Sequence, residues 1–176
     1  HLFDLALDLR DAELMNAGEG LIRTDPPAEE PVPLGLLCAE TDALLELGEA
    51  SLALQRVEEL RGRTAGSAEA WQGDVRMARL LCRALKEEET LRVLGAFRDP
   101  DGAPFGRESI LVELSALSET LLGNAETPAV VEGFWTRSIV EREKGNAEGE
   151  IDALRQVIQK GLSDYRAPAY LRLAER

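Results

Sequence analysis

Residues able to do acid–base or nucleophilic chemistry are few and scattered in this chain of 176 residues. The single histidine is His1, so general base catalysis would have to rest on carboxylates or lysine. Cys38 and Cys82 lie among apolar residues (LLCAE and RLLCRAL), with no histidine or carboxylate at ligand spacing. Thiols in such surroundings usually pack as small hydrophobic side chains. We therefore expect no catalytic residue, no cofactor and no metal site.

Acidic segments of the sequence are explained by helix ends and turns. Glu87, Glu88 and Glu89 fall at an expected helix joint, where acids favour the positive end of the next helix dipole. The segment DPDG, residues 99–102, lacks the extended spacing and final acid of a calcium loop, so we interpret it as a turn. No phosphate-binding glycine loop, serine elbow or zinc pattern occurs. The sequence thus predicts a protein that is not an enzyme.

The net charge of the chain limits the classes of partner that we expect it to bind. Lys and Arg total 20 against 33 Asp and Glu, which gives a net charge of -13. The arginines alternate with acids, so no basic face is expected that would bind nucleic acid or an anionic membrane. No apolar run approaches the length that spans a bilayer, so membrane insertion is not expected.

The cysteines and the first residue of the chain are the sequence features that bear on its cellular location. Cys38 and Cys82 fall in different expected helices, which argues against a disulfide, and reduced thiols favour the cytoplasm. The chain begins with His1 and shows no signal peptide, which is consistent with a fragment of a longer or exported protein. A homodimer is left open.

The spacing of apolar residues predicts an all-α protein. Leu, Ala, Glu and Arg, which are strong helix formers, are abundant, and no stretch alternates as a strand does. An N-terminal region, residues 1–33, consists of a helix and a proline-rich linker at 24–33 and precedes a helical domain, residues 34–176. We expect eight or nine helices, at 1–16, 34–47, 50–62, from about 67, 87–97, 107–122, from Thr127, 147–161, and from about Ala167 to the end.

Capping residues mark the starts of two of these helices, and one of the two is apolar on two sides. Ser67 is the expected N-cap of the helix containing SAEAW, and Thr127 is the expected cap of another helix, with Pro128 at its first helical position. In the first of them one side is formed by Trp71, Val75, Ala78, Cys82 and Leu85, and a second side by Met77, Leu80 and Leu81. A helix that is apolar on two sides is expected to lie between two neighbours.

Glycines mark the joints between several helices. Gly48, Gly123 and Gly145 each follow a helix end, and a new amphipathic pattern begins within three or four residues. Glycine adopts the left-handed conformation that ends a helix at little steric cost. A link this short folds the second helix back antiparallel to the first, so each glycine predicts a helical hairpin.

Repeated hairpins of this kind resemble tetratricopeptide repeats, which are helix–turn–helix units of about 34 residues. Thr41 lies seven residues before Gly48 and Ala53 five after it, near the small positions of that family. Ser138 lies seven residues before Gly145, and Phe134 occupies the aromatic position near the start. The resemblance covers residues 34–175 and implies antiparallel hairpins stacked as an α-solenoid; another α-solenoid or an irregular bundle is the alternative.

The sequence departs from the family pattern at several points. Glu150 stands where a small residue is expected, and Lys86 replaces a turn glycine in the middle unit. Gly123 and Gly145 are only 22 residues apart, so the pairing of helices is not fixed by the sequence.

The resemblance implies a non-catalytic scaffold that binds a peptide or a partner helix on the concave face of the array. The acidic balance favours a ligand of basic or mixed charge. Candidate partner-binding residues are Arg76, Arg79, Arg83, Arg137 and Trp135. The competing roles are a solvated or salt-bridged surface for the arginines and core packing for Trp135. The alternative function is a sensor or coupling module of a larger regulatory protein, such as a transcription regulator.

Overall fold

A computed structural model describes residues 32–98, 105–161 and 163–175. The expected helix at 1–16, nearly all of the proline-rich linker and the turn at 99–102 lie outside the described residues. The described helices belong to one compact unit, Leu34–Arg176.

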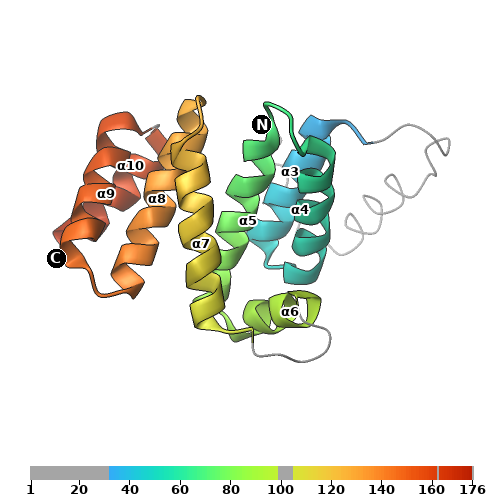
Figure 1. Ribbon diagram of the computed structural model, residues 1–176, viewed down its shortest axis with the longest axis horizontal. Helices are drawn as coiled ribbons and strands as arrows, with labels where there is room; N and C mark the ends of the chain where they lie inside the picture. Colours follow the sequence, from blue (N-terminus) through green and yellow to red (C-terminus); the bar gives the residue numbers. More distant parts are fainter. Residues whose placement is uncertain (1–31, 99–104, 162, 176) are drawn as a thin grey trace, which may run out of the picture. The chain divides into compact units, whose positions relative to one another are not determined.

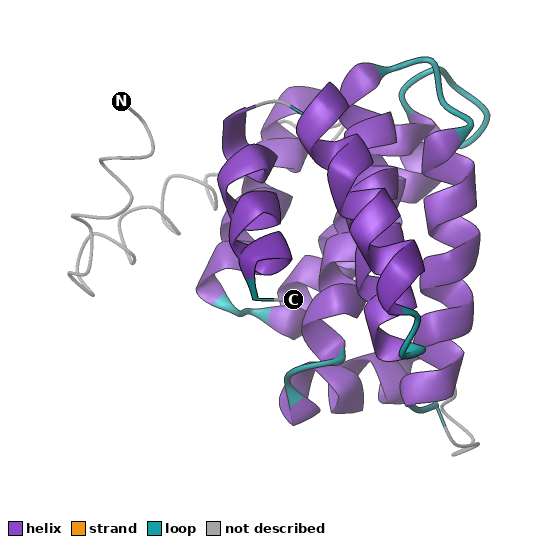
Figure 2. Ribbon diagram, turned by 90° about the vertical axis from the view of Figure 1, so that its left-hand side faces the viewer, coloured by secondary structure: helices purple, strands orange, loops and turns teal. Residues whose placement is uncertain are grey.

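Eight helices and no strand make up the described residues, which confirms the all-α class (Figures 1 and 2). They are α3 (Leu34–Leu47), α4 (Ala50–Thr64), α5 (Ala70–Ala84), α6 (Glu88–Arg98), α7 (Arg107–Leu122), α8 (Thr127–Glu143), α9 (Ala147–Lys160) and α10 (Ser163–Ala174).

The start of α5 differs from the sequence prediction. Ser67 does not cap the helix, because the N-cap is Glu69 and the helix begins at Ala70. The Ser67 hydroxyl instead donates to the Thr64 carbonyl at 2.9 Å and accepts from the Glu69 N–H at 3.1 Å. Ser67 therefore stabilises the turn before the helix.

Two further helix starts need correction. The N-cap of α8 is Glu126, so Thr127 and Pro128 are the first residues of the helix itself. Asn124 accepts the Glu126 N–H at 2.9 Å and fixes the preceding turn. Helix α10 begins at Ser163, before the expected start near Ala167, and therefore contains Pro168 in its interior.

Neighbouring helices pack in a regular order. Helix α3 packs on α4 and α5, and α4 packs on α5. Helix α5 packs in turn on α7 and α8, α7 on α8, α8 on α9, and α9 on α10. The short helix α6 contacts α4 and α5 and lies at their lower end in Figure 1.

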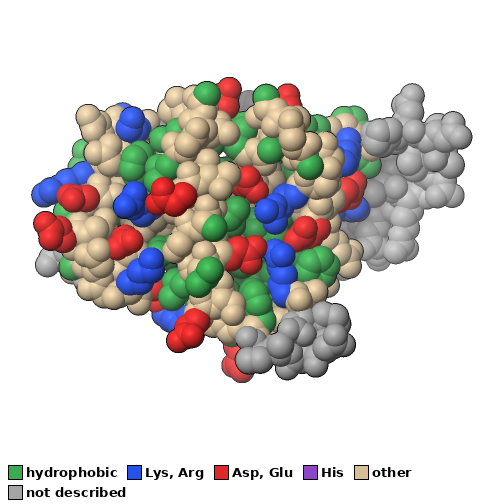
Figure 3. Space-filling model, viewed as in Figure 1, with side chains coloured by type: hydrophobic (Ala, Val, Ile, Leu, Met, Phe, Trp, Pro, Cys, Tyr) green, Lys and Arg blue, Asp and Glu red, His purple; other side chains and the backbone are tan. Residues whose placement is uncertain are grey.

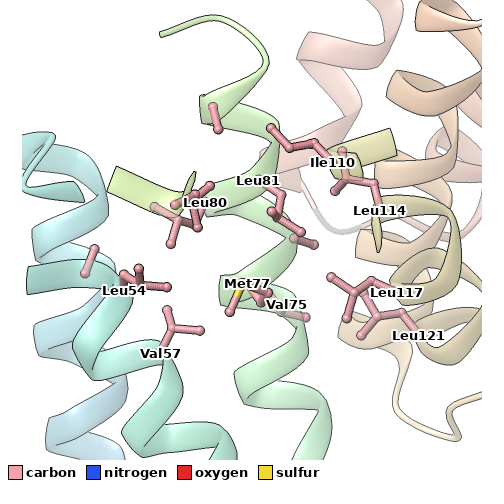
Figure 4. Packing of buried hydrophobic residues seen from close by; sticks show 14 of the residues in the cluster. Leu54, Val57, Val75, Met77, Leu80, Leu81, Ile110, Leu114, Leu117 and Leu121 are labelled. Carbon is pink, nitrogen blue, oxygen red and sulfur yellow. The ribbon is translucent and has the colours of Figure 1, made fainter. Parts of the chain in front are cut away.

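Helix α5 lies at the centre of the larger apolar core. Figure 4 shows its buried side chains directed at Leu54 and Val57 of α4 and at Leu114 and Leu117 of α7. Met77, Leu80 and Leu81 are all buried. The prediction that this helix lies between two neighbours is confirmed.

The three glycine joints end helices by two different means. Gly48 and Gly145 adopt φ angles of 83° and 76°, as predicted for left-handed caps. The Gly48 N–H donates to the Leu44 carbonyl at 3.1 Å, which closes the last turn of α3. Gly123 has a φ of −78°, so the left-handed cap expected there is wrong, although α7 does end at Leu122.

Candidate functional site

Side chains of α5 that face α3 form hydrogen bonds across the helix pair. The Arg76 guanidinium donates to Asp42 Oδ2 at 2.5 Å and to the Cys38 carbonyl at 3.3 Å. Two turns on, Arg83 donates to the Leu45 carbonyl and to Glu87 Oε2. Because Asp42, Cys38 and Leu45 all belong to α3, these arginines hold α5 along α3.

Arg79 joins α5 to three other helices. Its Nη2 donates to Glu132 Oε2 of α8 at 3.1 Å and to the Tyr165 hydroxyl of α10 at 2.6 Å. Its Nη1 lies 3.5 Å from Asp42 Oδ1 of α3. Asp42, Arg76, Arg79, Glu132 and Tyr165 form one connected polar cluster, which we call the polar seam.

Glu132 is the buried member of the polar seam, with a side chain only 4% exposed. It accepts hydrogen bonds from Arg79 and from the Tyr165 hydroxyl. Burial, followed by the charge of Glu132, raises the pKa of Tyr165 above its usual range. Burial alone would lower the pKa of Arg79, but Glu132 and Tyr165 raise it, so Arg79 stays charged.

A second polar cluster connects α10 to α8 and α9. Arg172 of α10 donates to Glu150 Oε1 of α9 at 2.9 Å and to Ser138 Oγ of α8 at 3.2 Å. The same guanidinium lies 5.0 Å from the ring centre of Trp135, in cation–π contact. We call Trp135, Ser138, Glu150 and Arg172 the α10 clamp.

The two clusters meet at aromatic side chains. The rings of Trp135 and Tyr165 lie 5.9 Å apart at an interplanar angle of 59°. Beside the α10 clamp an open cavity of about 180 Å³ is lined by Arg142, Glu150, Arg172 and Glu175. Two cations and two carboxylates line it, so it is close to neutral.

Four of the five predicted site residues are brought near one another. Arg76, Arg79 and Arg83 line one side of α5, and Trp135 reaches Arg79 through Tyr165. Arg137 is apart from them, exposed and 3.8 Å from Glu119 of α7. Each of these arginines has an acceptor or carboxylate within the chain.

Sequence reasoning missed the carboxylates and the α10 residues of both clusters. Glu132 and Glu150 are buried, which their type does not suggest. A signal for Glu150 was present, because it occupies a position where a small buried residue was expected. Nothing in the sequence pairs Arg79 with Tyr165, which lies 86 residues away.

The thiols do not resemble reactive cysteines. Both are free, and the Cys38 thiol donates to Gln72 Oε1 at 2.9 Å. Burial, with a smaller contribution from Glu132, raises the pKa of Cys82 to about 12, so its thiol is protonated at neutral pH. Over the described residues no group of three or more His, Cys, Asp or Glu side chains gathers as a metal site would require.

Charges of both signs are interleaved on the face of the molecule seen in Figure 3. In the ranges that the structure describes, no helix has the length and apolar character needed to cross a bilayer. The arrangement of the described residues offers fixed donors and acceptors that join the helices.

No protein-family model matches this chain, and neither a curated protein nor a solved structure matches it. Inference about function therefore rests on the residues and their geometry.

Proposed function

We propose that this chain is a non-catalytic scaffold that binds a peptide or a partner helix on the face made by α3, α5, α8 and α10. In this proposal the hairpins are α3–α4, α5–α7 and α8–α9, stacked as in tetratricopeptide repeats, and α10 begins the next unit. Helix α6 is an insertion between α5 and α7. The packing of α5 on both α3 and α8 supports this order, since the first helices of successive units adjoin in such arrays.

The observation that carries the proposal is the set of contacts made by Arg79. One guanidinium reaches Asp42 of α3, Glu132 of α8 and Tyr165 of α10, so all four first helices meet at one residue. The Arg79 side chain is nevertheless 42% exposed. A partner lying on this face would meet fixed charges of both signs.

Charge indicates the class of partner. The net charge of -13 favours a ligand of basic or mixed charge, whose encounter is accelerated by long-range attraction and slowed by salt. The exposed Arg79 and the half-buried Arg83 of α5 would pair with acidic side chains of a mixed-charge ligand. Recognition of this kind needs no catalytic group.

The proposal is tested by capture with the full chain, followed by competition between matched variants. Proteins retained from an extract of the source cells are identified by mass spectrometry and their affinities are then measured one by one. Arg83→Glu changes the charge of the proposed face, whereas Arg155→Glu makes the same change on α9, outside it. The Arg155 side chain is 69% exposed and has a single ion pair, with Asp152, among the interactions found, so the control should fold.

The affinity of a partner of the proposed face should change at least tenfold with Arg83→Glu, falling where an acidic group of the partner meets Arg83 and rising for a basic partner, and change less than twofold with Arg155→Glu. Binding should also weaken as salt rises from low to physiological concentration. Equal effects of the two variants on every captured protein would contradict the proposal.

A further inference from the structure

Helix α10 is seated on α8 and α9 through one narrow face. The residues that make this contact are Tyr165, Ala169 and Arg172, spaced at i, i+4 and i+7, together with the partly buried Leu173. Ala169 is the one buried residue among the described side chains of α10, residues 165–175. Tyr170 and Leu171 are exposed on its outer side. Ala169 is thus the one fully buried apolar anchor of α10 among these side chains, with Tyr165 and Leu173 partly buried beside it.

The seat beneath α10 is polar at both ends. Glu132 and Glu150 are the two carboxylates that are buried within the described ranges, and each accepts a hydrogen bond from α10. Between them lie the apolar residues Val131, Leu154 and Val157. Glu132, Glu150 and these three residues, with Trp135, are here called the α10 seat.

Buried ion pairs make a contact that is selective and reversible. Desolvation of the two charges offsets most of their attraction, so a buried pair adds little compared with apolar packing. When α10 leaves, Glu150 and Arg172 both regain water. The same seat penalises any helix without a donor at the matching position, because a buried carboxylate would then lose the hydrogen bond that it accepts from α10.

The sequence of α10 also weakens the helix itself. Pro168 lies in its interior, lacks an N–H group and disfavours a helical conformation of the preceding residue. Pro168 is exposed, so it adds no buried contact in return. Helix α10 thus depends on its seat for its structure.

We propose that the α10 seat is a binding site for an arginine-bearing partner helix and that α10 is its displaceable occupant within the chain. The partner supplies a hydroxyl or basic donor to Glu132, a small residue four positions later, and an arginine seven positions later for Glu150 and Trp135. This inference rests on the proposed function and specifies the partner of one part of that face.

The test uses a fluorescent synthetic peptide with the sequence of residues 163–175 as the probe and the full chain as the receptor. The double variant Tyr165→Phe/Arg172→Gln loosens α10 in the receptor. The matched control, Arg166→Gln/Tyr170→Phe, makes the same two changes on the exposed side of α10. Circular dichroism establishes that each receptor is folded.

The loosened receptor should bind the probe at least tenfold more tightly than the wild-type chain, and the control should bind as wild type does. A probe carrying Arg172→Gln should lose at least tenfold in affinity for the loosened receptor. Equal binding by all receptors, absence of binding, or indifference to the probe arginine would overturn the proposal.

Hydrogen exchange in the intact chain gives a second test that needs no loosened variant. Pro168→Ala should slow exchange of the α10 amides several-fold and leave α3–α9 unchanged, because it strengthens only the occupant. Unchanged α10 exchange would contradict the proposal. Neither of these two assays uses a cellular partner, so a negative result in them contradicts only the proposal that α10 is displaceable. Absence of Arg83-dependent capture contradicts the proposed function instead.

Discussion

The hairpins α3–α4 and α8–α9 are built alike around their turns. Each turn has a left-handed glycine, Gly48 or Gly145. Seven residues before it, Thr41 and Ser138 are both buried, and each donates its hydroxyl to a carbonyl of its own helix at 2.7 Å. The two hairpins therefore share the same local solution for packing the first helix.

The hairpins differ five residues after the glycine. Ala53 is fully buried in α4, and the equivalent residue of α9, Glu150, is 1% exposed. Glu150 is accommodated because Arg172 of α10 donates to it. The first hairpin is thus closed by apolar packing, and the second is completed by a charge from the following helix.

The largest expected effect comes from giving the first hairpin the acid of the second. Ala53→Glu buries a carboxylate without a cationic partner and overfills a packed site, so it should cost about 3–5 kcal/mol of the free energy of unfolding, or prevent folding. Urea denaturation measures the loss, with Ser51→Glu on the exposed side of α4 as the control. A loss below about 1 kcal/mol would show that the hairpins do not differ at this position.

Removal of the arginine should affect the second hairpin less severely. Arg172→Gln removes the guanidinium that donates to Glu150. Release of α10 would return the Glu150 carboxylate to water and so limit the loss of stability. We expect a loss of about 2 kcal/mol in urea denaturation, against less than 0.5 kcal/mol for Arg166→Gln. A loss as large as that of Ala53→Glu would mean that α10 cannot leave its seat.

The glycines provide a graded test of the turns. A Cβ on Gly48 would lie 2.7 Å from Arg83 Nη2, whereas one on Gly145 would meet nothing within 4 Å. Gly145→Ala should cost about 1 kcal/mol of the free energy of unfolding because of its positive φ. Gly48→Ala should cost about 2 kcal/mol, because the Arg83 guanidinium must also move. Gly123→Ala should change the free energy of unfolding by less than about 0.5 kcal/mol, and equal losses at all three positions would contradict this account.

The smallest effect concerns the thiol of Cys82 near the polar seam. Its pKa rises from 9.0 to about 12 on folding, mainly through burial. The fold favours the neutral thiol, so this stabilisation is complete below pH 9 and is lost as the pH rises from 9 to 12. Between pH 8 and 10 the wild-type chain should lose about 1 kcal/mol more than Cys82→Ala in urea denaturation. Parallel losses would contradict the assigned shift.

Local signals in the sequence predicted the helices well. Apolar spacing and the glycine joints gave α3 and α7 with the bounds that the structure has, and α9 within one residue. The errors concerned the residues at which helices begin. Ser67 bonds within the preceding turn, and Pro168 was expected in the first turn of α10 although it lies inside that helix.

Contacts between distant residues could not be predicted in the same way. The polar seam joins Asp42, Arg79, Glu132 and Tyr165, and no periodic pattern relates their positions. Glu150 was visible as an exception to a repeat pattern, but its partner Arg172 comes from another helix. Burial of a charge becomes understandable only when the neighbouring helix is in place.

The central claim, that a partner lies on the face made by α3, α5, α8 and α10, is tested most directly by hydrogen exchange of the full chain with and without a captured partner. The account predicts slower exchange in α3, α5 and α8, altered exchange in α10, and no change in α4 and α7. Slower exchange confined to α4 and α7 would contradict it.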